Sequence, residues 1–205
     1  MRIQVRAGRV DQMNGGVRVI AALEGERKPE RLLPPYVTRD RELARLIAGA
    51  GFRGSRNETV FLPRGAQWVL VVGLGKAKDL SLDVVRQFAG AAARAVRARG
   101  HHSLVLPMVS ERGLGAPATV AQAMAEGAWL GLYRYDKLKQ VPRHERRLRI
   151  DRITLAVERR GDTAAAKRAV EKAGVLAEAV SLARDLITGP SNVVTPTHLA
   201  HQARA

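Results

Sequence analysis

The sequence alternates between two hydrophobic periodicities, which predict strands and helices in turn. Apolar and polar residues alternate over residues 3–7, as in a half-buried strand, and a second apolar run covers residues 17–23. Asn14-Gly15-Gly16 lies between them and is a strong turn signal. A hairpin of these two segments is expected, although each could equally pair with other strands.

Further apolar segments predict a strand–helix succession along the rest of the chain. Strands are expected at residues 58–62, 68–72, 103–108 and 149–158, and helices at 39–49, 82–99, 118–133 and 163–186. The second of these strands is a continuous apolar run, typical of a strand covered on both faces. Ser81 is a candidate N-cap for the helix that follows, and Gly100 ends that helix. On the last and longest helix, a stripe is formed by Val175, Ala179, Leu182 and Leu186.

This succession favours an α/β layer sandwich with a mostly parallel or mixed sheet. We expect one α/β domain over residues 1–160, a connecting helix over 161–190, and the beginning of another domain over 191–205. Thr195-Pro196 is typical of a helix start, since proline is favoured at the first helical position.

The composition excludes several classes of protein. There is no cysteine, so disulfides, thiolate metal sites and a cysteine nucleophile are impossible. No apolar run reaches the roughly 18 residues that a membrane span needs, and no apolar leader begins the chain. A soluble cytoplasmic protein without a membrane partner is therefore expected.

The net charge of +16 suggests a polyanion partner, although the arginines are spread along the chain. The one dense cluster contains Arg143, Arg146, Arg147 and Arg149. These side chains are candidates for contacts to nucleic-acid phosphates. The favoured alternative is a solvated loop that joins a helix to a strand.

Gly73-Leu74-Gly75-Lys76 follows a predicted buried strand and precedes a helix, where a phosphate-binding turn would lie. It lacks the third glycine of the dinucleotide fingerprint and does not fit the P-loop pattern. The glycines are better explained by a tight strand exit. Anion binding by Gly73 and Gly75, assisted by Lys76 or Lys78, is the alternative.

The sequence offers no convincing catalytic or metal centre. His101-His102 and the pair His198 and His201 are weak zinc candidates, because neither has the pattern of a metal site. The acidic residues are scattered, and no serine lies in a nucleophile elbow. We therefore assign no catalytic residue and no metal ligand in this chain.

Four segments together resemble the dinuclear-zinc leucyl (cytosol) aminopeptidases. They are "VVGLGK" at 71–76, similar to the family's "VGLGK", the alanine- and arginine-rich helix at 88–99, the "EG…L..Y…K" segment at 126–139, and "RDL…PSN..TP..LA" at 184–200. Each motif is moderately specific, but all four occur in the order found in that family.

The resemblance implies a macro-domain-like, three-layer α/β domain with a mixed, mostly parallel sheet, followed by a long C-terminal connecting helix. The metal-binding and the catalytic motif of that family both lie beyond the Pro-Ser-Asn turn, and this sequence contains neither motif. The chain is thus expected to be an inactive N-terminal domain concerned with structure and assembly, with no cofactor of its own. The parent enzyme would use two divalent metal ions, zinc or manganese, and would be a hexamer.

Two other hypotheses remain from the sequence. The first is a nucleic-acid-binding module that uses the basic surface. The second is binding of a nucleotide or ADP-ribose by analogy with macro domains, which fold alone does not establish.

Overall fold

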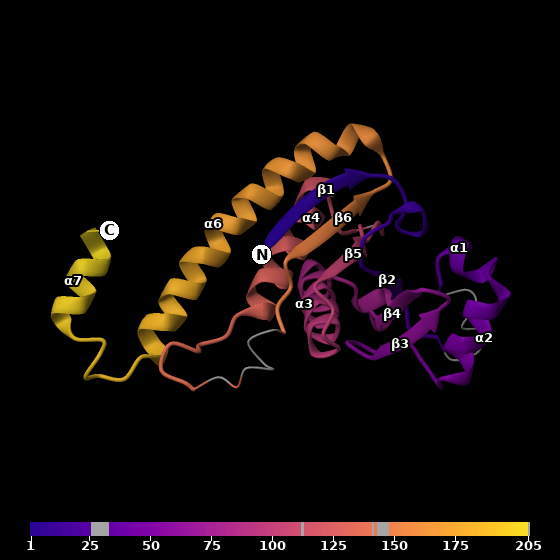
Figure 1. The fold of residues 1–205 in the computed structure, drawn as a ribbon. Helices are drawn as coiled ribbons and strands as arrows, with labels where there is room; N and C mark the ends of the chain where they lie inside the picture. The colour runs from indigo at the N-terminus through magenta and orange to yellow at the C-terminus, as the bar shows by residue number, and fades with distance from the viewer. Residues whose placement is uncertain (26–32, 112, 141, 143–147, 205) are drawn as a thin grey trace.

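The computed structural model describes residues 1–25, 33–111, 113–140, 142 and 148–204. The centre of the fold is a six-stranded sheet in the order β1-β6-β5-β2-β4-β3 (Figure 1). All neighbouring strands are parallel except the antiparallel pair β3 and β4. The strands are β1 (Arg2–Ala7), β2 (Val17–Ala22), β3 (Thr59–Arg64), β4 (Gln67–Gly73), β5 (Ser103–Pro107) and β6 (Arg152–Val157).

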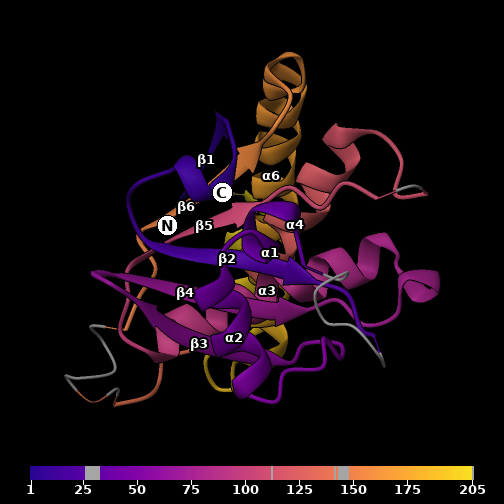
Figure 2. The ribbon, with the colours of Figure 1, turned by 90° about the vertical axis from the view of Figure 1, so that its right-hand side faces the viewer.

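Helices cover both faces of this sheet. The larger core lies on the side of α3 (Leu82–Ala98), α4 (Pro117–Leu132) and α6 (Thr163–Thr188). On the other side lie α1 (Pro35–Thr38) and α2 (Arg41–Gly49), with the short 3-10 turn η1 (Val10–Gln12) over β5 and β6 (Figure 2). The expected three-layer α/β fold with a mixed, mostly parallel sheet and a long C-terminal helix is confirmed.

The prediction of an N-terminal hairpin is wrong. β1 lies at the sheet edge beside β6, whereas β2 lies between β5 and β4. The glycines before β2 serve a close approach instead of a two-residue turn. Gly16 has a φ of 130°, and a Cβ there would lie 2.5 Å from the backbone oxygen of Ser103, at the start of β5.

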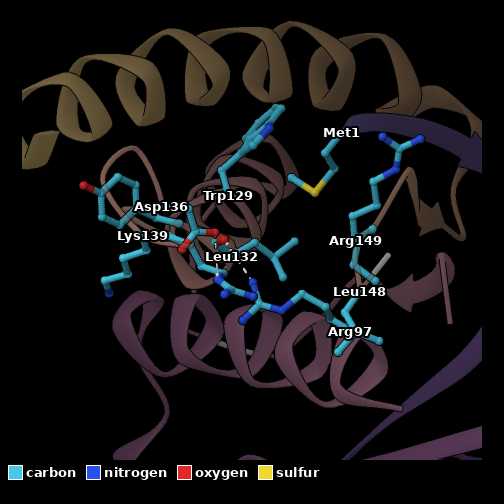
Figure 3. Close-up of a pocket in the computed structure, with 11 residues that line it drawn as sticks. Met1, Arg97, Trp129, Leu132, Asp136, Lys139, Leu148 and Arg149 are labelled. Carbon is cyan, nitrogen blue, oxygen red and sulfur yellow. Dashed lines mark hydrogen bonds and ion pairs between the residues drawn. The ribbon is translucent and has the colours of Figure 1, made fainter. Parts of the chain in front are cut away.

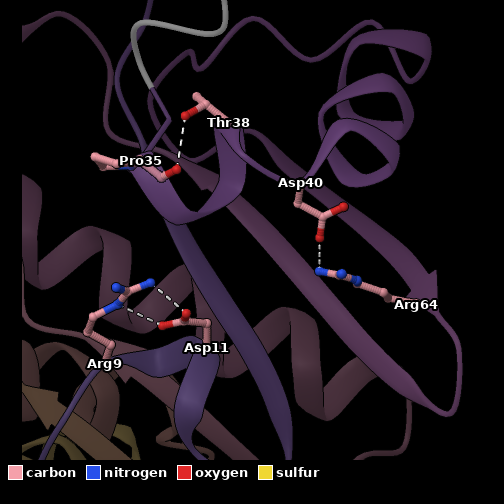
Figure 4. Close-up of polar contacts among 6 residues, drawn as sticks. All are labelled: Arg9, Asp11, Pro35, Thr38, Asp40 and Arg64. Atoms are coloured by element: carbon pink, nitrogen blue, oxygen red, sulfur yellow. Dashed lines mark hydrogen bonds and ion pairs between the residues drawn. The ribbon is translucent and has the colours of Figure 1, made fainter.

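The local signals around the other elements agree with the structure. The hydroxyl of Ser81 accepts a hydrogen bond from the Val84 amide at 3.4 Å, and Gly100 follows α3 with a φ of 76°. Asp40 caps α2 by accepting from the Leu43 amide at 3.2 Å, and it also pairs with Arg64 of β3 (Figure 4). The cap therefore ties α2 to the sheet edge.

Glycines allow α3 and α4 to pack backbone against backbone. A Cβ on Gly127 would lie 2.0 Å from the carbonyl oxygen of Arg86, and one on Gly131 would lie 2.7 Å from the Cα of Gly90. Next to this contact, the buried Glu126 accepts a hydrogen bond from Arg86 at 2.7 Å. The Glu-Gly of the family-like segment thus fixes the crossing of the two helices.

Candidate functional site: the C-terminal helix and its clasp

The loop after α4 is fastened to the C-terminal part of α6 by polar contacts. The Tyr133 hydroxyl donates to the Asp185 carboxylate at 2.9 Å, and the Lys137 ammonium lies 2.8 Å from its other oxygen. The Arg184 guanidinium lies over the Tyr133 ring, 5.3 Å from its centroid. We call these four residues (Tyr133, Lys137, Arg184 and Asp185) the clasp. It joins two of the four segments that carried the resemblance, which sequence spacing alone did not show.

The charges in the clasp support one another. The Lys137 ammonium, and then the Tyr133 hydroxyl, lower the pKa of Asp185 below its ordinary value. The hydrogen bond to Asp185 in turn raises the pKa of Lys137. Partial desolvation, followed by the hydrogen bond to Asp185, raises the pKa of Tyr133. The clasp is therefore in its charged, hydrogen-bonded form at neutral pH.

α6 carries two apolar faces. The face packed on the domain consists of small side chains, and its buried members are Ala166, Val170, Ala173 and Ala177. The predicted stripe through Val175, Ala179 and Leu182 lies elsewhere on the helix and is exposed. The periodicity thus identified the helix, but the stripe that it singled out is not the one that packs on the domain.

The side of α6 that faces away from the domain carries several exposed large apolar side chains. Its side chains are well exposed, with Val175 at 68% and Ile187 at 84%. Further large apolar residues are exposed after the end of the helix. Its members are Val175, Leu176, Val180, Leu182, Ile187, Val193 and Leu199. A concentration of exposed large apolar side chains is typical of an interaction surface.

A compact turn follows α6. The amides of Val193 and Val194 both donate to the Pro190 carbonyl at 2.9 Å. A Cβ at Gly189 would lie 2.4 Å from the Val194 side chain, so glycine permits this close approach. The expected helix start is confirmed: Thr195 accepts from the His198 amide at 3.2 Å, and α7 (Pro196–Arg204) begins with proline.

The turn at Gly73 uses its backbone amides within the protein. The amides of Gly73, Leu74 and Gly75 donate to carbonyl oxygens of Glu58, Ala22 and Gly54, respectively. A Cβ on Gly73 would lie 2.0 Å from the Ser55 carbonyl oxygen. This geometry agrees with the tight-exit interpretation. Of the predicted anion site, the side chains of Lys76 and Lys78 are exposed and remain within reach of an anion.

The adjacent histidines have separate partners. His101 stacks on Phe61 with ring centroids 5.4 Å apart, and the Nδ1 of His102 lies 2.9 Å from the Arg149 carbonyl oxygen. Among the described residues, no group of three or more His, Asp or Glu side chains could hold a metal ion. The described part of this chain therefore does not fit the two metal ions that the family resemblance implies for the parent.

Of the predicted basic cluster, the structure describes Arg149. Arg143, Arg146 and Arg147 lie outside the described residues. Arg149 lines a cavity together with Arg97, Arg134 and Lys139, which the sequence did not single out. These cations come from α3 and from the loop after α4, so only the fold brings them to Arg149 (Figure 3).

The fold and the clasp together define an α/β domain whose two family-like helical segments meet at one junction. The model of the cytosol aminopeptidase family, N-terminal domain, matches residues 38–142. The chain therefore belongs to the cytosol aminopeptidase family, of which it contains the N-terminal domain.

Individual relatives agree with this assignment. A probable cytosol aminopeptidase of Halorhodospira halophila is 31% identical over 100% of this chain and 42% of its own length. One of Roseiflexus castenholzii is 36% identical over 78% of this chain and 33% of its own. The chain thus spans a third to two fifths of the length of these relatives.

Solved structures show the same architecture. The bottromycin maturation enzyme BotP in complex with Mn is 28% identical over 92% of this chain and 35% of its own, with a TM-score of 0.68. A mutant of tomato leucine aminopeptidase matches 98% of this chain and 41% of its own with a TM-score of 0.81, and its 22% identity supports the fold alone. No helix in the described residues is both long and apolar enough to cross a bilayer.

Proposed function

We propose that this chain is the non-catalytic N-terminal domain of a metal-dependent aminopeptidase and that α6 is its connection to the catalytic part. In this proposal residues 1–160 form the domain, 161–190 the connecting helix, and 191–205 the first segment of the catalytic domain. The parent would remove N-terminal amino acids from peptides with two divalent ions, as a cytoplasmic homo-oligomer.

The observation that carries this proposal is the second apolar face of α6. A helix that is apolar on two sides needs a partner on each. The described residues cover the alanine side and leave Val175, Leu182 and Ile187 exposed. The relatives are more than twice as long as this chain, which is consistent with further chain packing on that face.

The clasp supports the same role. It fixes the part of α6 that extends beyond the last buried alanine, Ala177, and it does so with contacts from the loop after α4. The exposed face is thereby held in one orientation before any partner binds. This pre-organisation lowers the entropy lost on docking.

The proposal is tested on the full-length gene product, which we expect to continue past Ala205 into carboxylate-rich metal-binding motifs. The double variant Leu182→Glu with Ile187→Glu places two charges on the exposed face. The isolated chain should keep its unfolding midpoint, because both side chains are solvent-exposed. The full-length variant should lose peptidase activity and assembly, because docking would bury unpaired carboxylates.

Lys167→Glu is the matched control, since it adds a carboxylate to an exposed position of α6 outside this face. A full-length double variant that assembles and turns over like the control would contradict the docking role. The 205-residue chain itself should release no product from leucyl-p-nitroanilide with added zinc or manganese. Metal-dependent turnover by the chain would overturn its non-catalytic assignment.

The nucleic-acid alternative rests on the net charge of +16. A filter-binding titration across salt tests it, because phosphate contacts give a steep loss of affinity with salt. Absence of affinity at about 50 mM salt would remove this alternative.

A further inference from the structure

A cavity of about 610 Å³ lies at the edge of the sheet where the parallel strands begin. It is bounded by the C-terminal ends of α3 and α4, by the loop after α4, and by the residues that lead into β1 and β6. Figure 3 shows Trp129 and Met1 on the α6 side and Arg97 on the α3 side, with Lys139 and Arg149 at opposite ends. Its volume is in the range of small-molecule sites.

The polar lining is strongly cationic. Four positively charged side chains face the cavity beside one carboxylate, Asp136, and they are Arg97, Arg134, Lys139 and Arg149. Asp136 pairs with Arg134 at 3.1 Å, and Arg149 pairs with Asp151 at 3.0 Å. Among the described residues, Arg97 and Lys139 have no carboxylate partner.

Arg97 is the least exposed of these cations. Its guanidinium is half-buried and donates to the Leu132 carbonyl at 3.1 Å, which fixes its direction. Burial, and then the neighbouring Arg134 and Arg94 charges, lower the pKa of Arg97. A bound anion would relieve this repulsion between like charges.

The rest of the lining is apolar and partly aromatic. Its side chains are those of Met1, Trp129, Leu132, Leu148 and Ile150. The ring edge of Trp129 packs against Gly174 of α6, where a Cβ added to the glycine would lie 3.4 Å from the indole ring. This contact holds Trp129 in place. A fixed indole next to arginines suits a flat ring that carries a charged group.

We propose that this cavity binds a small organic phosphate with a planar ring, of the mononucleotide class. The phosphate lies between Arg97, Arg134 and Lys139, because guanidinium groups match phosphate oxygens in a bidentate way. The ring lies on Trp129 and Leu132. The cavity is open to solvent on one side and bounded on the others by α3, α4 and the residues that lead into β1 and β6. Its volume is that of a site for one small molecule, which favours such a ligand over a nucleic-acid strand.

At the opposite edge of the sheet, the described residues form a smaller and less basic cavity. The cavity beyond β5 and β6 has a volume of about 110 Å³. The charged residues that the structure describes in its lining are Glu111, Glu158 and Asp162 beside Arg159, and their net negative charge disfavours a pyrophosphate. Ligands of open α/β sheets usually bind at the carboxyl ends of the strands, and here the charge places an anion at the other edge.

The test uses tryptophan fluorescence. The chain has two tryptophans, so Trp68→Phe leaves Trp129 as the sole reporter. AMP should quench it saturably, with a dissociation constant below about 1 mM. Inorganic phosphate and adenosine, each carrying half of the proposed chemistry, should bind at least tenfold more weakly.

Two variants in the Trp68→Phe background connect the signal to the cavity. Arg97→Gln should weaken AMP binding about tenfold, as expected for a hydrogen bond to a charged group. Lys139→Gln should weaken it a few-fold, because Lys139 is exposed. Arg41→Gln, an exposed site on α2, removes the same charge far from the cavity and should change nothing.

The proposal is overturned if AMP gives no saturable quenching. It is also overturned if adenosine or phosphate alone binds as tightly as AMP, or if Arg97→Gln behaves like Arg41→Gln. Circular dichroism of each variant separates a lost site from a lost fold. The outcome is independent of the docking role of α6, which uses a different surface.

Discussion

The close crossing of α3 and α4 can be tested with Gly127→Ala. The added Cβ would lie 2.0 Å from the Arg86 carbonyl oxygen, and its next neighbours are the Arg86 backbone carbons at 2.7 Å. Ordinary carbon contacts lie near 3.5 Å, so the helices would have to separate by roughly 1.5 Å. Because the obstacle is backbone, no side-chain rotation can relieve it.

The cost can be bounded from two opposing effects. Overpacking of this kind destabilises by about 1–3 kcal/mol, and a backbone clash belongs at the upper end. Replacing a mid-helix glycine by alanine stabilises the helix by about 1 kcal/mol. The net expectation is a loss of about 2 kcal/mol, equivalent to a fall of roughly 4–8 °C in Tm for a chain of this size.

Thermal and urea unfolding followed by circular dichroism measure this loss. Gly49→Ala is the matched control, because a Cβ there meets no atom within 4 Å and its φ is not positive. The control should be neutral or stabilised by up to about 1 kcal/mol. If Gly127→Ala unfolds at the same midpoint as the control, the two helices are not in backbone contact and the account given for the Glu-Gly segment fails.

Three further outcomes are expected. Because the pKa of Asp185 is lowered, the clasp contributes stability above the ordinary aspartate pKa of about 3.9. This stability is lost as pH falls through the lower pKa of Asp185 in the folded protein. Carboxyl NMR should show that Lys137→Ala raises the pKa of Asp185, and an unchanged pKa would contradict the pairing. Burial raises the pKa of Tyr36 to about 12, so the stability that this hydroxyl contributes is present below pH 10 and is lost as pH rises towards 12. The pKa of Tyr133 is raised as well, so the ultraviolet titration of wild type should show late titration that is reduced, not abolished, in Tyr36→Phe. Identical curves for the two proteins would exclude the buried position of Tyr36. Asp40→Ala removes both the α2 cap and the contact to Arg64, so it should lower the free energy of unfolding in urea by about 1–2 kcal/mol. Arg64→Ala removes the contact alone and should lower it by at most about 1 kcal/mol. Equal losses for the two variants would mean that the cap contributes little.

Local signals in the sequence predicted the elements well, because each depends on a few neighbouring residues. Ser81 at the start of α3, the apolar run of β4 and the Thr195-Pro196 start of α7 all appear as expected. Strand order was less accessible. The choice between a hairpin and a crossover for β1 and β2 depends on the edge that β6 offers, which lies about 150 residues away in the chain.

The candidate site shows the same limit. The exposed stripe on α6 could be seen as apolar, but burial of the alanine stripe depends on the shape of α4, which periodicity does not contain. Of the cations that line the cavity, the sequence pointed to Arg149 alone. Arg97 and Lys139 reach it from elements separated by more than thirty residues, and no spacing rule connects them.

The length of α6 has a mechanical consequence. Its 26 residues span about 39 Å, and the stretch after Ala177 projects about 16 Å past its last buried anchor. A small rotation of α6 at its contact with α4 therefore produces a larger displacement at the C-terminal end of the helix. The packed face with Val170 and three alanines, together with the contacts of Asp185, sets the direction of this projecting part. Replacing Asp185 is therefore expected to change the position of any partner that packs on that end of the helix.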